Sequence, residues 1–495
     1  MGSYTQLGEP YRHPGATSHF FKKLGSYFGV GGKNIVVDSG VGFATINGLS
    51  VTYPADIDRL DGVRIDMIII THAHADHFVG AIALAKRHPE ALVVFSRPAS
   101  LSGWINASDT LKIAQSNIKQ ALEHGRTPDP LLFSYDDMVE FFERAVILEH
   151  PQWISPWKGW EIGFHNCGHQ RGAMSVFILP PHGRPIYITG DTSSHNVETT
   201  RGILVPSDEF LGDFLKRKGV VLITEATNGA RFYNDLTRDA EKEKLRAKVG
   251  EIRDRNGRIF NPCFAQDRSA SLALFYAKMQ IPSHVDGLAR EFLRTYADPE
   301  SIWCEDDIPF PLKDLMDKGL IFFFEEDKKA WEIAKAHRIM ADRGYDHCAP
   351  FSAIISPSAT MEKGHAVSHA IEILPQGESA CVFTGHIFSD TPSEKLMQMS
   401  DPIERIKRGH TIKINNNGKI VPVDVRCDVM KVDWTGHDGG QALVERADFV
   451  GESSGSDVIV IGHHGDDENR AGLQKGVEEL GLKYIDGTYL KEYDL

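Results

Sequence analysis

The sequence predicts an α/β protein in which one domain is divided by a second, inserted α/β domain. The 495 residues exceed the usual length of one compact domain. Short apolar runs separated by turn residues fill the N-terminal part and return after about residue 420, and strand-like and helix-like segments alternate between them. We therefore expect residues 1–228 and 424–495 to form one domain, and residues 229–423 to form the inserted domain.

The two outer segments contain short apolar runs bounded by Gly, Asp and Pro, which is the pattern of β-strands. In the N-terminal segment these runs are KNIVVDSG, DMIIITHAHADH, ALVVFS, GWEIGFHNCGH and RPIYITGD. In the C-terminal segment they are VPVDVRCDVMKVDWTGHDGG and DVIVIGHHGDD.

The middle of the sequence adds helical periodicity. Leu245, Val249 and Ile252 are spaced i, i+4 and i+7 within the charged segment 237–255, which predicts a helix that ends near Gly257. A strand-like RIFNPCFA and a helix-like RSASLALFYAKM follow, and the alternation continues through SAIISPSATMEKGHAVSHAIEIL and ACVFTGHIFSD. This alternation predicts a mainly parallel sheet.

The composition is that of a globular protein with a hydrophobic core, because 41% of the residues are hydrophobic and 25% are charged. The longest apolar runs, such as MIII and VIVI, are too short to cross a membrane, and the N-terminus lacks the apolar core of a secretion signal. The six cysteines form no CxxC pair, which indicates reduced thiols. We expect a cytoplasmic protein with no membrane partner.

The net charge of −14 argues against a nucleic-acid-binding protein, which usually has a basic face. A cluster of metal ions can reverse the sign of the charge at a site, so the objection depends on whether such a cluster exists.

The segment THAHADH concentrates metal-binding side chains directly after an apolar run. His72 and His74 are two residues apart on an extended segment, so they point to the same side and can share one ion. Asp76 and His77 follow as the chain turns, which suits a second ion. Imidazole and carboxylate ligands favour zinc, with manganese or iron as alternatives.

Other candidate ligands lie where more distant strands end. They are His169 in CGHQRGA, Asp191 in ITGDTS, and His463 or His464 in VIGHHGDD. A carboxylate such as Asp191 can bridge two ions, which lie about 3.5–4 Å apart in two-metal sites. The sequence therefore predicts a dinuclear metal centre. The remaining histidines that we considered are interpreted as ordinary polar residues: His165, His182, His195 and His386.

These motifs resemble those of the metallo-β-lactamase superfamily. THAHADH is similar to its HxHxDH signature, VVDSG to its early aspartate, CGHQRGA to its third-histidine motif, and TGD to its bridging aspartate. The resemblance implies a four-layer αββα domain.

Further motifs resemble the β-CASP nucleases within that superfamily, which include the pre-mRNA 3′-end processing endonuclease and prokaryotic ribonucleases. LITEATNGARF is similar to ESTYG, GRIFNPCFAQDRSASLALFYAKM to IPAFAxGRxQE, IISPSATMEKGHAVSHAIEIL to IxxSGMxxGGP, KVDWTGHDGGQAL to FSAHADQ, and VIVIGHHGDD to xxVHGE. The last similarity selects His464 over His463, and His463 is interpreted as an ordinary polar residue. The resemblance implies a β-CASP domain inserted into the αββα domain, with the active site in the cleft between them.

The resemblance also implies a ligand set for two zinc ions, with manganese as an alternative. One ion would be held by His72, His74 and His169, the other by Asp76, His77 and His464, with Asp191 bridging them.

The implied reaction is hydrolysis of a phosphodiester. A hydroxide that bridges the two ions would be the nucleophile, and His437 would be the general acid that protonates the leaving oxygen. Glu225 would favour the protonated form of His437. Asp38 would orient a metal-bound histidine, or alternatively form only a turn.

Four residues of the inserted domain are candidates for substrate binding: Arg268, Ser269, Ser358 and Gly385. For each of them, helix capping or turn formation is an equal alternative. The chain also departs from the family pattern. FTGHIFSDTPSEK lacks the arginine of GYQxxGTxGR, Ala359 replaces a glycine, and TGHDGG lacks the small-residue–Asp pair after the histidine.

The resemblance implies a zinc-dependent ribonuclease that cuts single-stranded RNA in processing or decay, by internal or 5′-to-3′ cleavage. Alternatives are a DNA nuclease, a small-molecule metallo-hydrolase and a non-catalytic RNA-processing subunit. His464 favours RNA over DNA as the substrate, because the family's DNA enzymes have an apolar residue at that position. The long insertion argues against a small-molecule substrate. The filled ligand positions argue against a non-catalytic subunit. A homodimer is an open alternative, since many relatives dimerise.

Overall fold

The structure, a computed structural model, is organised as two compact units. The first unit comprises Met1–Tyr233, Glu300–Asp307 and Gly436–Leu495, and the second comprises Asn234–Pro299 and Ile308–Thr435. The residues that the structure describes are 2–8, 16–24, 26, 32–46, 49–123, 125, 127–214, 216–232, 238–324, 351–401, 403, 405–406, 409–416, 418–454, 457–487 and 491–494.

The first unit contains two seven-stranded sheets. The order in one sheet is β24 (Glu492–Asp494), β1 (Ser3–Gln6), β2 (His19–Leu24), β3 (Lys33–Val37), β6 (Met67–Ile69), β7 (Leu92–Ser96) and β8 (Val146–Leu148). The order in the other is β23 (Lys483–Asp486), β22 (Ile459–His463), β13 (Val221–Glu225), β12 (Ile186–Ile188), β11 (Met174–Leu179), β10 (Glu161–Asn166) and β9 (Gln152–Ile154). A hairpin, β4 (Val41–Ile46) and β5 (Leu49–Pro54), lies apart from both sheets.

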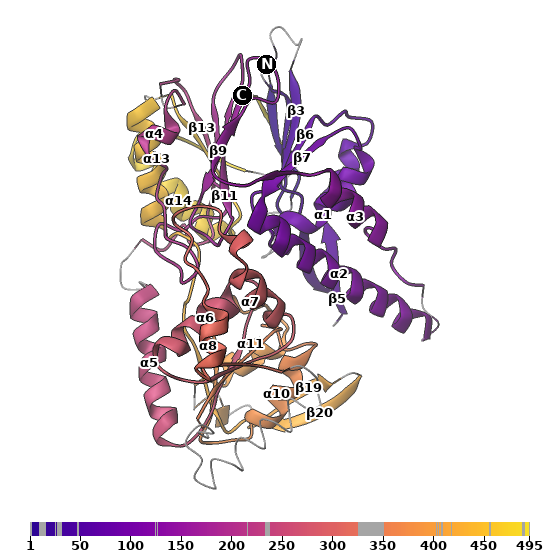
Figure 1. Cartoon of the computed structure of the whole chain (residues 1–495), viewed down its shortest axis with the longest axis vertical. Coiled ribbons are helices and arrows are strands. Elements are labelled where there is room, and N and C mark those ends of the chain that lie inside the picture. Colours follow the sequence, from indigo (N-terminus) through magenta and orange to yellow (C-terminus); the bar gives the residue numbers. More distant parts are fainter. Residues whose placement is uncertain are drawn as a thin grey trace. The chain divides into compact units, whose positions relative to one another are not determined.

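The two sheets of the first unit share one hydrophobic core and carry helices on their outer faces. Val36 and Ile68 of the first sheet belong to the same buried cluster as Ile162 and Ile223 of the second. Helices α1 (Ala75–Arg87), α2 (Arg97–Glu123) and α3 (Tyr135–Arg144) lie on one side, and α13 (Gly440–Ser454) and α14 (Asp467–Glu479) lie on the other (Figure 1). The predicted α/β class is confirmed, and the layers are those of an αββα domain.

The second unit is built on a parallel sheet, as the alternation of strands and helices predicts. Its strand order is β16 (Ile321–Phe323), β15 (Ser283–Val285), β17 (Ala353–Ser356), β14 (Ile259–Pro262), β18 (Ala380–Phe383) and β21 (Asp428–Lys431). Its longer helices are α5 (Arg238–Asp254), α6 (Arg268–Lys278), α7 (Ala289–Ala297) and α10 (His365–Ile373), with shorter ones at α8 (Leu312–Asp317) and α11 (Pro392–Gln398). A hairpin of β19 (Thr411–Asn416) and β20 (Lys419–Asp424) completes it.

The second unit extends further along the sequence than the expected segment 229–423. Strand β21 pairs in parallel with β18, so the residues up to Thr435 group with the second unit and not with the C-terminal segment. At the other end, the chain enters the second unit at Asn234. The helix expected at 237–255 corresponds to α5, and its periodic residues Leu245, Val249 and Ile252 are fully buried.

Glu300–Asp307, which we call the strap, is a segment of the inserted sequence that belongs to the first unit. Trp303 lies in the core of that unit, and its indole Nε1 donates a hydrogen bond to the carbonyl oxygen of Leu148 (2.9 Å). Ser301 accepts a hydrogen bond from the guanidinium of Arg171 (2.6 Å), and Asp307 forms an isolated β-bridge with Thr200. The sequence pattern predicts that the strap lies in the inserted domain, because no local pattern reveals where a single tryptophan packs.

We expect Trp303→Ala to destabilise the first unit by about 3–5 kcal/mol, because the indole is 3% exposed and its loss leaves a cavity. Urea denaturation followed by circular dichroism would measure the change. Trp104→Ala is the control, since Trp104 is 38% exposed, and we expect it to cost about 1 kcal/mol. Equal losses for the two variants would contradict the anchoring role of Trp303.

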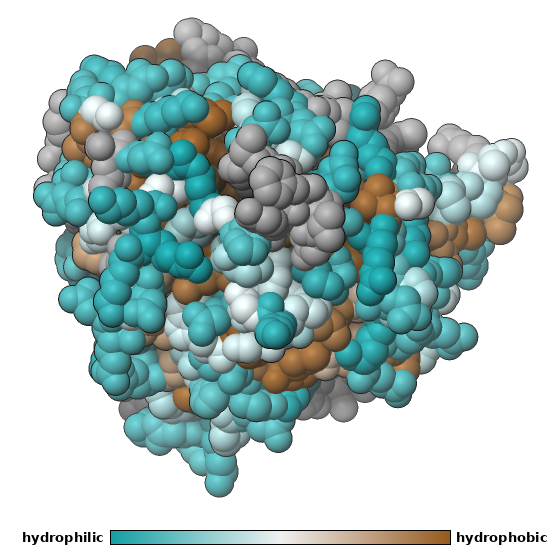
Figure 2. Space-filling model, turned by 90° about the horizontal axis from the view of Figure 1, so that it is seen from above, coloured by the Kyte–Doolittle hydropathy of each residue, from teal (hydrophilic) through white to brown (hydrophobic). Residues whose placement is uncertain are grey.

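The face shown in Figure 2 is mostly hydrophilic, with brown patches between the hydrophilic residues. The large hydrophobic residues that are exposed in the described part of the chain belong to several elements. Among the helices in the described part of the chain, none combines the length and apolarity needed to cross a bilayer.

Candidate metal centre

The THAHADH segment folds as a strand followed by a helix, which divides its four ligand candidates into two pairs. Strand β6 ends before Thr71, His72 is 1% exposed, and His74 is the N-cap of α1. Asp76 and His77 lie in the first turn of α1, and their donor atoms form a group with His464. The loop after β3 crosses this turn so closely that a Cβ on Gly40 would lie 1.7 Å from the carbonyl oxygen of Asp76, so a residue without a side chain is required there.

A first group of four donors comprises His72, His74, His169 and Asp191, whose donor atoms all lie within 4.8 Å of one another. His74 Nδ1 lies 3.1 Å from His72 Nε2 and 3.2 Å from His169 Nε2. Asp191 Oδ2 lies 3.5 Å from His72 Nε2 and 3.7 Å from His169 Nε2.

A second group comprises Asp76, His77 and His464. His464 Nε2 lies 3.4 Å from His77 Nε2 and 3.2 Å from Asp76 Oδ2. Asp191 faces this group too, because its Oδ2 lies 3.4 Å from His77 Nε2 and its Oδ1 lies 3.6 Å from His464 Nδ1. Asp191 is therefore positioned between the two groups.

The donor set fits a pair of divalent cations. Burial lowers the pKa of His74 to about 3 and that of His169 to about 4, so both rings are neutral at pH 7 and offer a lone pair, as a metal ligand must. Asp191 Oδ1 is buried and accepts no hydrogen bond from any residue that the structure describes. Buried charges are costly unless they are paired or coordinate metal, and nitrogen–oxygen donor sets of this kind suit zinc.

The charge of Asp191 and His77 supports the same interpretation. Burial alone would raise the pKa of Asp191, but His464, His77 and His437 hold it well below its usual value. Burial alone would lower the pKa of His77, but the surrounding carboxylates, led by Asp191 and Asp76, raise it well above its usual value. The carboxylates that favour a proton on the His77 ring would also favour a metal cation in place of that proton.

Asp38 lies behind His77 and fixes its ring. Its Oδ2 accepts hydrogen bonds from His77 Nδ1 (2.8 Å) and Thr71 Oγ1 (2.8 Å), and its Oδ1 accepts one from the Thr71 amide (2.7 Å). His77 Nε2 is thereby directed at the donor group, which is how carboxylates commonly orient histidine ligands.

We expect Asp38→Asn to weaken metal binding by ~10–100-fold, since the ring of His77 loses its charged acceptor. Titration of the metal-free protein with zinc against a competing chelator would measure this. Asp66→Asn is a matched control. Asp66 precedes β6, the strand that leads to THAHADH, and its carboxylate contacts Asn34 and Lys33, neither of which is a candidate ligand. Unchanged zinc affinity in Asp38→Asn would show that Asp38 only forms a turn.

A histidine–carboxylate pair lies beside the two groups. Glu225, at the end of β13, is fully buried, and its Oε2 accepts a hydrogen bond from His437 Nδ1 (2.8 Å). His437 Nδ1 also lies 4.0 Å from Asp191 Oδ2. Burial alone would lower the pKa of His437, but Glu225 and Asp191 raise it to about 9. The protonated ring can therefore act as an acid at neutral pH.

The four candidates for substrate binding all belong to the second unit. Ser269 is fully buried and its hydroxyl donates to the carbonyl oxygen of Ala265 (2.5 Å), which is a local helix contact. Arg268 begins α6, the Ser358 hydroxyl lies 2.7 Å from that of Thr360, and a Cβ on Gly385 would lie 2.8 Å from the ring of Phe264.

Four polar residues around the site have no role predicted from the sequence: Thr71, Thr192, Asp438 and Arg446. Thr71 opens the THAHADH segment, but its contact with Asp38 and the contacts of the other three with the site depend on segments that lie far apart in the sequence. His463, interpreted as an ordinary polar residue, is fully buried, and its ring lies 4.3 Å from that of His19.

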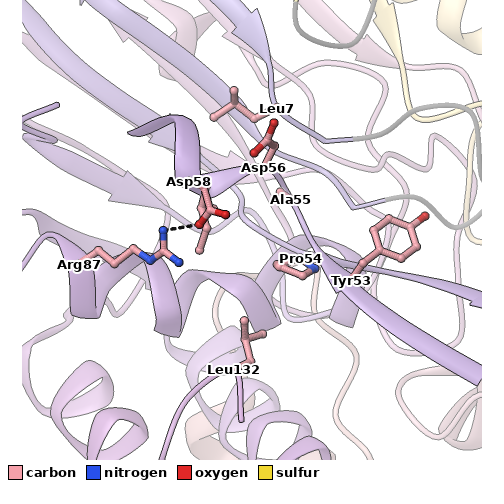
Figure 3. A pocket seen from close by; sticks show the side chains of 9 residues that line it. Leu7, Tyr53, Pro54, Ala55, Asp56, Asp58, Arg87 and Leu132 are labelled. Atoms are coloured by element: carbon pink, nitrogen blue, oxygen red, sulfur yellow. Dashed lines mark hydrogen bonds and ion pairs between the residues drawn. The ribbon is translucent and has the colours of Figure 1, made fainter. Parts of the chain in front are cut away.

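A cavity of about 320 Å³ lies elsewhere in the first unit (Figure 3). It is lined by Leu7, Tyr53, Pro54, Ala55, Asp56, Ile57, Asp58, Arg87 and Leu132, and Arg87 forms an ion pair with Asp58 (2.5 Å). The cavity contains none of the metal-binding candidates.

Comparison with known proteins gives one family match. The model of the metallo-beta-lactamase superfamily matches residues 26–104, which include the THAHADH segment.

Three similar curated proteins each have 23% sequence identity to this chain, which matches only part of the length of each. An RNase J-like protein of Methanocaldococcus jannaschii is 23% identical over 382 residues, 74% of this chain and 77% of that protein. Endoribonuclease YSH1 of Gibberella zeae is 23% identical over 470 residues, 91% of this chain and 52% of that protein. The transcription termination factor FttA of M. jannaschii is 23% identical over 430 residues, 85% of this chain and 61% of that protein. This chain thus spans about half the length of the YSH1 protein.

One solved structure, a protein of unknown function from Enterococcus faecalis V583, aligns over 100% of both chains with a TM-score of 0.55 and 13% identity. This likeness concerns the fold alone.

Proposed function

We propose that this chain, which contains a metallo-beta-lactamase superfamily match over residues 26–104 and is similar to an RNase J-like protein and to endoribonuclease YSH1, is a zinc-dependent ribonuclease that hydrolyses phosphodiester bonds of single-stranded RNA. That the chain is a metal-dependent hydrolase follows from the family; RNA as the substrate and zinc as the metal are our proposals. The names of the relatives, RNase J-like protein and endoribonuclease, support RNA.

The observation that carries the proposal is the position of Asp191 between two donor groups with the His437–Glu225 pair beside it. We propose that His72, His74 and His169 hold one zinc ion, that Asp76, His77 and His464 hold the other, and that Asp191 bridges them. When bound, two divalent cations would lower the pKa of water enough to supply hydroxide as the nucleophile at neutral pH, and would neutralise charge on the phosphate oxygens. They would also offset the net charge of −14 where the substrate phosphate lies.

The protein side chains then supply the proton and the orientation. His437 would donate a proton to the oxygen that leaves phosphorus, and the leaving strand would depart as an alcohol. Glu225 accepts a hydrogen bond from His437 Nδ1, so the other ring nitrogen, Nε2, would be the one that donates the proton. Asp38 keeps His77 in the ligand orientation.

The test is cleavage of 5′-labelled RNA and of DNA of the same sequence, each with and without a chelator, with zinc restored afterwards. We expect cleavage of RNA that the chelator abolishes and zinc restores. Cleavage of DNA in preference to RNA would identify a DNA nuclease, and hydrolysis of small esters alone would identify a small-molecule hydrolase. A protein that contains zinc but cleaves no substrate would contradict the proposal altogether.

A further inference from the structure

A fully buried ion pair lies directly behind His437. Asp438 follows His437 in sequence, and Arg446 lies in α13; both residues are 0% exposed. The guanidinium Nη2 of Arg446 donates to Asp438 Oδ2 at 2.7 Å. This is the position at which the chain departs from the family pattern, because Asp438 follows the histidine immediately.

The pair also holds the loop that follows Asp191. Asp438 Oδ1 accepts a hydrogen bond from the amide of Ser194 (2.6 Å), and the amide of Asp438 donates to the carbonyl oxygen of Thr192 (2.7 Å). Arg446 Nη1 donates to Thr192 Oγ1 (3.2 Å), and its Nε donates to the carbonyl oxygen of Leu204 (2.7 Å). The ion pair therefore fixes the two residues on either side of Ser193 to the segment that carries His437.

These contacts close a ring of hydrogen bonds around the candidate acid. The amide of Thr192 donates to Glu225 Oε1 (2.6 Å), and Glu225 Oε2 accepts from His437 Nδ1 (2.8 Å). His437 is joined to Asp438 by a peptide bond, and the hydrogen bond from the Asp438 amide to the Thr192 carbonyl oxygen closes the ring. The ring thus links the acid, its orienting carboxylate and the loop of Asp191 in one connected unit.

We propose that Asp438 and Arg446 are positioning residues that hold His437 at a fixed place relative to Asp191; this rests on the proposed function. Neither side chain touches the candidate donors, so both act through the ring. A buried ion pair contributes little net stability, because the loss of hydration offsets the attraction between the charges. An apolar pair of similar volume often gives the folded protein equal stability. A displacement of about 1 Å between reacting groups can cost ~10²-fold in rate. Positioning is therefore the effect that this pair can supply and an apolar pair cannot.

Four variants test the proposal: Asp438→Asn, Arg446→Met, the apolar pair Asp438→Leu/Arg446→Met, and Arg258→Met. The last is the matched control, since Arg258 forms a partly buried ion pair with Glu372 (2.7 Å) in the second unit. Turnover is measured on RNA and on the reporter bis(p-nitrophenyl) phosphate, together with zinc content, thermal unfolding, and amide hydrogen exchange of the peptides that contain 191–194 and 437–438.

We expect both single variants and the apolar pair to lose ~10²-fold in kcat, with KM changed less than about threefold and zinc content unchanged. The apolar pair leaves the amide of Ser194 and the carbonyl oxygen of Leu204 without these partners, so it should unfold below the wild-type temperature, and the amides at 191–194 should exchange faster. Arg258→Met should lose stability without this change in kcat or in local exchange.

Recovery of wild-type kcat in the apolar pair would overturn the proposal, because the ion pair would then be only structural. If the apolar pair does not fold, Thr192→Val decides: it removes the acceptor of Arg446 Nη1, and unchanged kcat with unchanged exchange would again overturn the proposal. If the wild type hydrolyses the reporter but no RNA, the proposed function fails while the comparison of variants stands. If the wild type hydrolyses neither substrate, the amide hydrogen exchange data alone decide. Equal protection of the amides at 191–194 in Asp438→Asn and in the wild type would then overturn the positioning proposal.

Discussion

Replacing His437 by alanine is expected to lower kcat for RNA cleavage by ~10²–10⁴-fold, while the zinc content stays at the wild-type level. The effect is large because the leaving oxygen loses its proton donor, and the zinc is unaffected because His437 is not one of the proposed ligands. Initial rates on labelled RNA and metal analysis of the purified protein would provide both measurements.

The pH profile adds an independent check on the same residue. The neighbouring carboxylate Glu225 raises the pKa of His437, so the acid is present at neutral pH and is lost as the pH rises through that pKa. Wild-type turnover should therefore decline on the alkaline side, and this limb should be absent in His437→Ala. His182→Ala, at an exposed histidine, is the control. Unchanged turnover in His437→Ala would remove this residue from the mechanism.

The second large effect is expected for Asp191→Asn. The carboxylate lies within 3.4–3.7 Å of ring nitrogens from both donor groups, and an amide provides neither the negative charge nor a second anionic oxygen. We expect less than two zinc ions per chain and a loss of turnover of ~10³-fold or more, because several kcal/mol of charge stabilisation disappear. Metal analysis after dialysis and RNA cleavage would measure these changes.

Asp213→Asn serves as the control for that substitution, since its carboxylate is exposed and pairs only with Lys216 among the described residues. A variant at Asp191 that keeps two zinc ions and full turnover would contradict the bridging role.

Local patterns in the sequence predict the α/β class, which the structure confirms, and nominate the four candidate ligands of THAHADH. Alternating apolar runs determine where strands form, and the spacing of THAHADH determines which of its side chains point together, so both are readable without tertiary information. His169, Asp191 and His464 could be nominated because each follows an apolar strand. Their convergence depends on the order of strands in the second sheet, which local spacing does not reveal.

What sequence reasoning missed depends on long-range packing. Asp438 and Arg446 are eight residues apart, yet their significance lies in contacts with Thr192 and Ser194, more than 240 positions away. The boundary near residue 435 is set by the pairing of β21 with β18, which a change in composition does not mark. In both cases the deciding interaction joins segments that are remote in sequence.

The strap has a consequence for how this gene can be divided. Eight codons in the interior of the inserted region specify Glu300–Asp307, which is a piece of the other fold. A shortened gene that joins residue 233 directly to residue 436 would therefore encode the first unit without Trp303, and the core of that unit would have a cavity where the indole packs. The coding sequences of the two units alternate along the gene, so a single deletion cannot remove one unit completely and leave the other intact.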